Sequence, residues 1–324
     1  GNKVAGEFIE KVKKYQLLDA DGRFDPDKNW NQIPDMPKRP LNHQKEDFFE
    51  KGDPESASEN LVFDVKKSSG KPSDREQAIT LTENDEPMIS VVTPSFNQGQ
   101  FIEQTIHSVL SQNYSNVEHI IIDGASTVGT IEILRRYPHL KWISEKESGQ
   151  SEALSKGLRI ARGEIVGWLN SDDWYESGAF EVITSFFKAN PTKNVVMGNC
   201  NLVDENGIIF DKVINEERGF EELKKYWIAR SVPTQPAVFF RRKLLTQLGY
   251  IDETLHYAMD YDLWMRFAQK NHFYHLDVTV ANYRFHQAAK GGDQDWNKFV
   301  PEWKLVSERY TKIKVSTPLV SVII

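Results

Sequence analysis

In the middle of the chain, short apolar runs alternate with segments whose apolar residues recur every three or four positions. The run ISVVT at 89–93 has the composition of a buried strand. The next segment, 101–112, places Ile102, Ile106 and Val109 at helical spacing, which predicts an amphipathic helix. The same alternation continues downstream. Further strands are predicted at 118–123, 140–144 and 165–169, and further helices around 131–134 and at 150–161.

Strands that alternate with helices predict parallel βαβ crossovers, so the fold class is α/β with a mostly parallel sheet. In such sheets ligands bind outside the carboxyl ends of the strands. Ser95, Asp123 and the pair Asp172-Asp173 each follow a predicted strand, so we expect them at one edge of the sheet. Beyond these acids the pattern predicts a mixed, less regular half for a second substrate. Its strands are predicted at 195–197, 208–213 and 237–241, and its helices at 180–187, 244–248 and 260–269.

Both ends of the chain differ from this middle part. Residues 1–86, apart from a helix predicted at 8–18, are rich in Pro, Asp, Lys, Asn and Ser and predict an extension or linker. The predicted catalytic domain is 87–315. The last residues, TPLVSVII, repeat the character of EPMISVVT at 86–93. Two buried strands can look alike by chance; the sharper hypothesis is that 316–324 begins a second, truncated domain.

Composition and charge narrow the function classes. Of the 324 residues, 39% are hydrophobic and 27% charged, and no window reaches the roughly 18 apolar residues that a membrane span needs. The formal charge of −7, without a long Lys/Arg block, argues against a nucleic-acid partner. The single cysteine, Cys200, excludes an intramolecular disulfide and a Cys-based zinc site. With no signal pattern at the amino terminus, we expect a cytoplasmic protein, with peripheral association at the inner face of the membrane left open.

The stretch WLNSDDW at 168–174 carries the strongest chemical signal. An apolar run ends at Asn170, and two adjacent carboxylates, Asp172 and Asp173, follow. Such a pair has three explanations: a solvated turn, a general acid/base pair, or a seat for a hard divalent cation. Mg²⁺ and Mn²⁺ take oxygen ligands and are held by one or two carboxylates while substrate phosphates complete the shell.

Four motifs in this order resemble the inverting family 2 glycosyltransferases with the GT-A fold. They are VVTPSFNQGQFI, IIIDGAS, SEKESGQSEALSKGLRIARGEIVGWLNSDDW and YAMDYDLWMRFA. The resemblance covers about residues 88–290 and rests on the combination of motifs. It implies a Rossmann-like central sheet flanked by helices, and a nucleotide-diphosphate sugar as the donor.

The resemblance also implies roles in donor binding. Phe96 would lie against the nucleobase and Asp123 would accept a hydrogen bond from it; a core aromatic and a strand-end turn acid are the alternatives. Asp172 would lie near the ribose. Helix amino termini often face anions, so the backbone after Ser148 would face the donor, although Ser148 and Ser151 could be plain caps. The full set of implied donor residues is Pro94, Ser95, Phe96, Asp123, Gly149, Gln150 and Asp172.

The metal and catalytic roles follow in the same way. Asp173 would be the direct ligand of Mn²⁺ or Mg²⁺, with Asp172 beside it, and the ion would stabilise the leaving nucleotide. His286, in YRFH, would add a metal or phosphate contact, or be structural. Asp260 would be the base that deprotonates the acceptor hydroxyl; a helix cap is its alternative.

The acceptor is expected to meet Gln235 in the segment 232–236, together with Trp227 and Trp264, because aromatic faces stack on sugar rings. The alternative for Trp264 is a core position. Asp262 and Arg266 are four residues apart, which on a helix predicts an ion pair.

Two positions depart from the family pattern. Met259 stands where the family usually has Glu, and Val128 stands where relatives commonly have Asp, which would charge the start of the next helix. Met259 therefore puts in doubt the charge beside Asp260, and Val128 puts in doubt the stability of the helix predicted around 131–134.

We therefore expect a metal-dependent inverting glycosyltransferase that moves a sugar to a hydroxyl of a glycan, either free or lipid-linked, in bacterial surface polysaccharide or glycoconjugate synthesis. A nucleotidyltransferase is one alternative, but it needs a Gly- and Lys/Arg-rich loop after the first strand, and the loop 94–99 contains no basic residue. A catalytically weak module that scaffolds a partner domain is the other. Hydrolysis or transfer of a sugar donor in the presence of Mn²⁺ distinguishes the glycosyltransferase hypothesis from these two alternatives.

Overall fold

The computed structural model describes residues 86–127, 129–225, 232–287, 289–290 and 296–312. Several sequence predictions fall outside these residues: the helix at 8–18, the extension up to residue 85, Val128, Trp227 and the repeat at 316–324.

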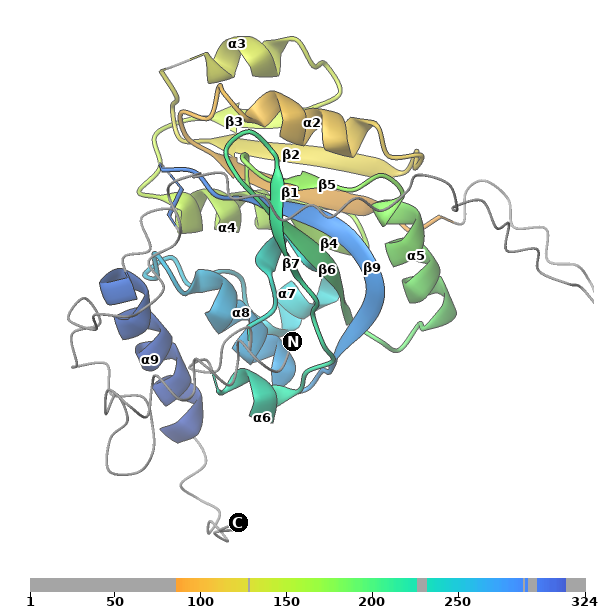
Figure 1. The fold of residues 1–324 in the computed structure, drawn as a ribbon, viewed down its shortest axis with the longest axis vertical. Coiled ribbons are helices and arrows are strands. Elements are labelled where there is room, and N and C mark those ends of the chain that lie inside the picture. Colours follow the sequence, from red (N-terminus) through yellow and green to blue (C-terminus); the bar gives the residue numbers. More distant parts are fainter. Residues whose placement is uncertain (1–85, 128, 226–231, 288, 291–295, 313–324) are drawn as a thin grey trace, which may run out of the picture. The chain divides into compact units, whose positions relative to one another are not determined.

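One nine-stranded sheet organises the described chain (Figure 1). Its strands run in the order β3-β2-β1-β4-β8-β6-β9-β5, and β7 pairs with β6. The first four strands in space are parallel, as predicted, and β8, β5 and β7 run against their neighbours. The bounds are β1 Ile89–Ser95, β2 Val117–Asp123, β3 Lys141–Ser144, β4 Ile165–Trp168, β5 Trp174–Tyr175, β6 Val195–Val203, β7 Ile209–Val213, β8 Val238–Arg241 and β9 Phe273–Arg284.

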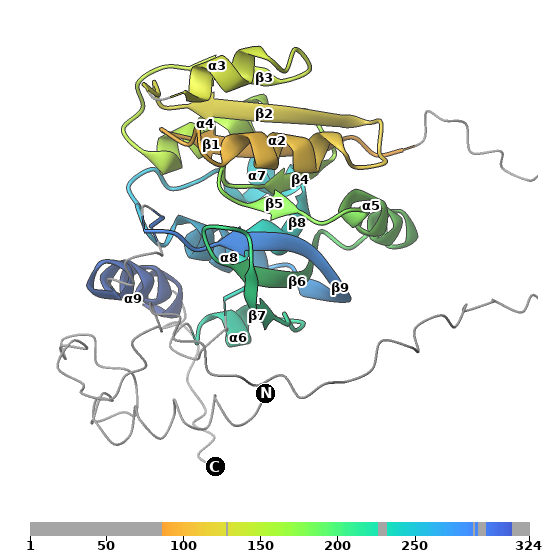
Figure 2. The same ribbon diagram turned by 45° about the horizontal axis from the view of Figure 1, so that its top comes forward.

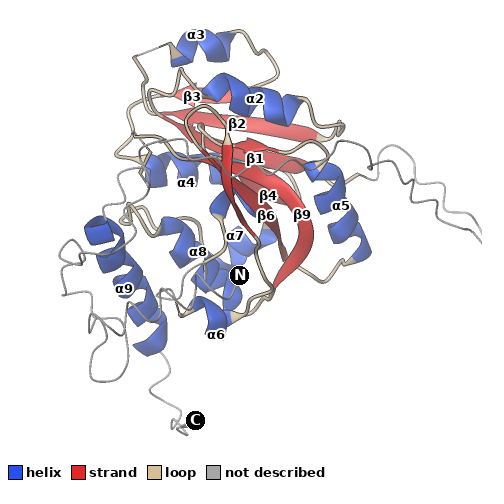
Figure 3. Ribbon diagram, in the orientation of Figure 1, coloured by secondary structure: helices blue, strands red, loops and turns tan. Residues whose placement is uncertain are grey.

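Helices cover both faces of this sheet (Figure 3). One apolar cluster joins α4, α7 and α8 to one face, and a second joins α5 and part of α2 to the other. The bounds are α2 Ile102–Leu110, α3 Thr130–Arg135, α4 Gln150–Ile160, α5 Ala179–Ala189, α6 Phe220–Leu223, α7 Lys243–Leu248, α8 Met259–Ala268 and α9 Trp296–Lys312, with the 3-10 turn η2 at Gln235–Ala237.

The strand sequences explain this two-sided packing. Successive side chains of a strand point to opposite faces, so Ile120 and Ile122 pack under α4 while Ile121 packs under α2 and α3. Gly157 lets α4 approach closely, because a Cβ there would lie 2.4 Å from Cγ1 of Val92. The α/β arrangement thus follows from buried, β-branched strands and one-sided helices.

The strand β9 is the main element that the pattern analysis does not predict. It is the longest strand, and its burial does not alternate: its middle residues are exposed and 280–282 are all buried. The pairing with β6 shifts register near Asn199, so one face does not stay buried along the strand. β9 matters for the site because its end delivers Arg284 and His286.

Candidate functional site

The carboxyl ends of the central strands form one edge, as predicted. Ser95 and Asp123 end β1 and β2 and are register partners. Asp172 and Asp173 lie in the turn between β4 and β5, beside the ends of the same strands.

The loops after β1 and β2 are tied together around Asp123. The buried Asp123 carboxylate accepts hydrogen bonds from Ser126 N at 2.9 Å, from Ser126 Oγ at 2.5 Å and from Ser144 Oγ at 2.7 Å. Asn97 N donates to Ser126 Oγ at 2.7 Å, and Asn97 Oδ1 accepts from the backbone N–H of Thr127 at 2.9 Å. Asp123 therefore organises both loops, which is the turn role weighed as its alternative.

Phe96 is not a core aromatic. The residue is 61% exposed just after β1, next to Gly124, where a Cβ would lie 3.3 Å from Phe96 Cδ2. The preceding residues, Pro94 and Ser95, are buried, and the Ser95 hydroxyl has no hydrogen-bond partner among the described residues. The edge of the sheet thus presents an open aromatic face, suited to stacking on a planar ring.

The amino termini of α4 and α8 meet in the site. Ser151 Oγ, in the first turn of α4, donates to Leu255 O and lies 3.1 Å from Met259 Sδ. Gly149 lies beside His256, whose Nδ1 would be 3.9 Å from a Cβ at residue 149. Neither Ser148 nor Ser151 acts as a side-chain cap of α4, whose N-cap residue is Gly149. Met259 is buried in the apolar cluster, so the position where the family has Glu is here part of the core.

Asn170 is a residue that the sequence analysis quoted but did not assign. Its Oδ1 accepts from Gln150 Nε2 and from Trp168 Nε1, both at 2.9 Å. Its Nδ2 donates to Gln235 Oε1 at 3.0 Å and to Asp173 Oδ2 at 3.3 Å. The amide uses both of its donors and two acceptor positions, so Asn170 joins the start of α4 to the acid pair. Its place directly after an apolar strand and before two acids was the available signal.

Asp173 is almost fully buried. Its Oδ1 accepts from the backbone N–H of Arg284 at 2.9 Å, and Thr105 Oγ1 donates to its carbonyl oxygen at 2.7 Å. Burial, followed by the neighbouring Asp172, raises the pKa of the Asp173 carboxyl well above its usual range. Two neighbouring carboxylates, one of them buried, repel each other when both are ionised, so a bound cation would stabilise their ionised forms.

Asp172 and His286 form a second contact in this cluster, and their side chains are largely buried, at 15% and 6% exposure. Nε2 of His286 lies 2.9 Å from Oδ2 of Asp172, and the imidazole packs against Phe101 with ring centroids 4.6 Å apart. The separation of 2.9 Å is the length of a hydrogen bond or ion pair, and the described residues contain no group of three or more His, Cys, Asp or Glu side chains placed to hold a metal ion. Carboxylate and imidazole groups nevertheless gather here, and these are among the groups that bind Mn²⁺ and Mg²⁺.

Arg284 holds the acid turn in place. Its Nε donates to the carbonyl oxygen of Asp172 at 2.9 Å, while its backbone N–H binds the Asp173 carboxylate. The guanidinium lies 4.6 Å from the ring centroids of both Phe101 and Trp174. Because Arg284 is bound to backbone carbonyl groups and aromatic rings, its role is to hold the turn that carries Asp172 and Asp173 in one conformation.

Asp260 lies in the first turn of α8 and is half-buried. Withdrawal from water raises the pKa of Asp260 to about 6, although the Tyr261 N–H, 2.7 Å from Oδ1, and the Lys290 ammonium oppose the rise. Burial, then Asp173, Asp172 and Asp260, raise the pKa of Tyr283. The base candidate and the acid pair thus shift the pKa of this phenol in the same direction.

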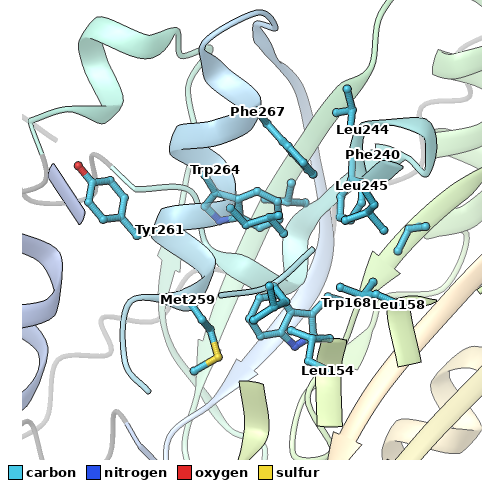
Figure 4. Packing of buried hydrophobic residues seen from close by; sticks show 14 of the residues in the cluster. Leu154, Leu158, Trp168, Phe240, Leu244, Leu245, Met259, Tyr261, Trp264 and Phe267 are labelled. Atoms are coloured by element: carbon cyan, nitrogen blue, oxygen red, sulfur yellow. The ribbon is translucent and has the colours of Figure 1, made fainter. Parts of the chain in front are cut away.

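The two acceptor candidates are placed differently from the expectation. Gln235 is buried, and both ends of its amide are occupied, by Trp168 O and Asn170 Nδ2. Trp264 has no exposed surface and packs among Phe240, Phe267 and other apolar side chains (Figure 4). The expectation that Trp264 stacks on the acceptor is corrected: it lies on the inner face of α8, which is the core alternative. The pair Asp262–Arg266 forms the predicted ion pair, at 2.9 Å.

Comparison with known proteins agrees with this geometry. Residues 90–249 match the family model described as glycosyl transferase family 2. Residues 90–249 therefore carry a glycosyl transferase family 2 domain, and the predicted family is confirmed for this part of the chain.

Relatives support the same family. The uncharacterized glycosyltransferase MJ1057 of Methanocaldococcus jannaschii is 28% identical over 57% of this chain and 66% of its own length. TuaG of Bacillus subtilis, a glycosyltransferase assigned by name to teichuronic acid biosynthesis, is 36% identical over 41% of the chain and 54% of its own. Chondroitin synthase of Escherichia coli is 24% identical over 62% of the chain and 29% of its own. The chain thus spans less than two thirds of these relatives.

Solved structures share the fold. The mannosyltransferase PcManGT of Pyrobaculum calidifontis, in complex with GDP-Man and Mn²⁺, has a TM-score of 0.52 at 20% identity, covering 72% of this chain and 67% of its own. TarS 1–349 of S. aureus, in complex with UDP-GlcNAc, has a TM-score of 0.51 at 19% identity, covering 62% and 60%. The predicted GT-A fold class is confirmed. None of the helices in the described ranges is long and apolar enough to span a bilayer.

Proposed function

We propose that this chain is a metal-dependent inverting glycosyltransferase that transfers a sugar from a nucleoside-diphosphate donor to a glycan hydroxyl. The observation that carries the proposal is the gathering of two adjacent carboxylates, Asp172 and the buried Asp173, with His286 hydrogen-bonded to Asp172, at the edge of the sheet where Ser95 and Asp123 also end their strands. When bound there, Mn²⁺ or Mg²⁺ supplies positive charge that stabilises the departing nucleoside diphosphate.

The donor lies along the edge of the sheet in this proposal. The exposed Phe96 ring stacks on the nucleobase, and the loop held by Asp123 shapes the pocket around it. The backbone at Gly149 and Gln150 faces the donor from the start of α4. PcManGT and TarS, of the same fold, are described with GDP-Man and UDP-GlcNAc, which supports a nucleotide sugar as the donor class.

Asp260 performs the chemistry on the acceptor side. Its carboxylate takes the proton of the acceptor hydroxyl as that oxygen attacks the anomeric carbon, and the bond from this carbon to the phosphate oxygen breaks on the opposite side. The configuration at the anomeric carbon is inverted. A carboxyl with a pKa of about 6 is ionised at neutral pH and is a stronger base than an ordinary aspartate.

The acceptor is proposed to be a growing surface polysaccharide or glycoconjugate. TuaG and chondroitin synthase are both named for polysaccharide synthesis, and both match the described domain. A lipid-linked acceptor would bring the protein to the inner face of the membrane. Fractionation of cells with and without the acceptor pathway would test that placement, and recovery only in the soluble fraction in both would contradict it.

The proposal is tested by a screen of nucleotide sugars with Mn²⁺, read by thermal stabilisation and by hydrolysis or transfer. One donor should stabilise the protein and release its nucleotide, and Asp173→Ala should abolish both effects. Glu253→Gln, an exposed acid outside the site, is the matched control and should behave as the unaltered protein. No response to any donor, or a full response from Asp173→Ala, would overturn the proposal.

A further inference from the structure

The helix α8, which carries Asp260, has no cap of its own. Its N-cap residue is Ala258, and no side-chain cap bond is present at that position. The N–H groups at the start of a helix need acceptors, and a carboxylate is a favourable one. Here the acceptor comes from a different helix. Glu302 of α9 supplies it, 44 residues beyond Ala258.

The contact between Glu302 and this turn is extensive. One carboxylate oxygen accepts from Tyr257 N at 2.7 Å and Ala258 N at 2.9 Å, and both oxygens lie 3.0 Å from His256 N. Three consecutive backbone amides thus point at a single side chain. Asp260 lies two residues beyond the last of them.

The helix α9 is fixed to α8 at its other end as well. Tyr310 OH donates to Asp262 Oδ1 at 3.0 Å, and Arg309 Nη1 lies 2.6 Å from Asp252 Oδ2 and 3.3 Å from Asp262 Oδ1. Val306 is fully buried in the same apolar cluster as α8. Figure 2 shows the two helices side by side. Glu302 is therefore presented to the turn from a fixed support.

Lys290 completes the surroundings of the base. Its ammonium donates to His256 O at 2.7 Å, so it binds the same turn that Glu302 holds. Glu302 and Lys290 are the charged groups that act on the Asp260 carboxyl, with opposite signs, and Asp260 in turn acts on Tyr283.

We propose that Glu302 is a positioning residue for the base: by holding the amides of 256–258, it fixes the turn that aims Asp260 and keeps those amides from drawing the Asp260 carboxylate away from the acceptor. This inference rests on the proposed role of Asp260. Without Glu302, the three amides lose their acceptor, and the turn that leads into Asp260 loses its support. Misplacement of a catalytic group by about 1 Å can cost roughly 100-fold in rate.

The test compares Glu302→Gln and Glu302→Ala with Glu308→Gln, which makes the same charge change on the same helix. We expect both Glu302 variants to lose about 10- to 100-fold in kcat, with the Kd for nucleoside diphosphate and Mn²⁺ within twofold of the unaltered protein. The acidic limb of the kcat profile should move to lower pH in Glu302→Gln, because removal of a nearby negative charge makes Asp260 easier to ionise. Glu308→Gln should match the unaltered protein in every measurement.

Two measurements do not depend on turnover. Amide hydrogen exchange at 256–258 should become at least 10-fold faster in Glu302→Ala, and the pKa of Asp260, followed by carboxyl NMR, should fall in Glu302→Gln. Unchanged exchange and an unchanged titration would overturn the inference, as would equal losses of kcat and nucleotide binding. Full turnover by Asp260→Asn would instead refute the proposed function, while exchange and titration would still decide whether Glu302 holds this turn.

Discussion

Nε2 of His286 lies 2.9 Å from Oδ2 of Asp172, although 114 residues separate them in the chain. The acid follows β4 and the histidine follows β9, and these strands are not neighbours in the sheet. The contact is possible because the end of β9 pairs with β5, directly after the acid turn, and Arg284 binds that turn. The site is therefore assembled by the fold from both halves of the domain.

This pairing makes His286 a test of metal binding. His286→Ala removes one of the proposed ligands, so we expect the Mn²⁺ concentration for half-maximal activity to rise at least 10-fold, with little change in thermal stability in the absence of metal. His272→Ala, at an exposed histidine before β9, is the control. A normal Mn²⁺ response in His286→Ala would assign this imidazole a structural role.

Replacement of the proposed base separates chemistry from binding. Asp260→Asn keeps the size and shape of the side chain but cannot take a proton, so kcat should fall by about 10²- to 10⁴-fold. Binding of donor and Mn²⁺, measured by calorimetry, should remain within a few-fold. Asp211→Asn, an exposed acid on β7, provides the matched control. If Asp260→Asn turns over normally, another group is the base.

The pH dependence of turnover follows from the same residue. Burial raises the pKa of Asp260 to about 6, and only the ionised form accepts a proton. We therefore expect kcat/KM to rise through about pH 6 to a plateau near neutrality, and to be half-maximal near the pKa. A profile that is flat between pH 5 and pH 7 would mean that Asp260 is already ionised or is not required.

Asn170 is expected to support both stability and donor use. Asn170→Ala leaves Gln150, Trp168, Gln235 and Asp173 without their shared partner. Loss of such a buried bond network should reduce the free energy of unfolding by about 1–3 kcal/mol, measured by urea denaturation, and raise the donor KM. Asn194→Ala, which removes a bond to Asn271, is the control outside the site. An unchanged donor KM would limit Asn170 to stability.

Trp264 is expected to matter for the core alone. Trp264→Ala creates a cavity between α8 and the sheet, which should cost about 3–5 kcal/mol of the free energy of unfolding. Trp264→Phe keeps most of the packing, so it should lose less and leave the acceptor KM unchanged. A raised acceptor KM in a stably folded Trp264→Phe protein would restore the stacking role that burial argues against.

Local patterns were sufficient for much of the fold. The strands up to β4 and the helices α2 and α4 were predicted to within two residues at most ends, because each has one period and a clear break at its end. The meeting of Ser95 and Asp123 followed from the rule that parallel strands end at one edge. These features depend on neighbours in the sequence.

The features that were missed depend on distant contacts. β9 has no single buried face because its register with β6 shifts, and Trp264 looks the same in sequence whether its helix turns it to the acceptor or to the core. The four partners of Asn170 lie on three separate segments of the chain. The cap that Glu302 provides for α8 likewise joins two helices. Such relationships appear only when the chain is folded.

The central claim is that Asp172, Asp173 and His286 hold a divalent cation that carries the nucleotide. It is tested most directly by anomalous diffraction near the manganese edge, from crystals grown with Mn²⁺ and a nucleoside diphosphate. The account predicts one strong peak within about 2.0–2.4 Å of ligand atoms from these residues and of two phosphate oxygens. A nucleotide bound along the sheet edge with no peak at this place, or with the ion held elsewhere, would contradict it.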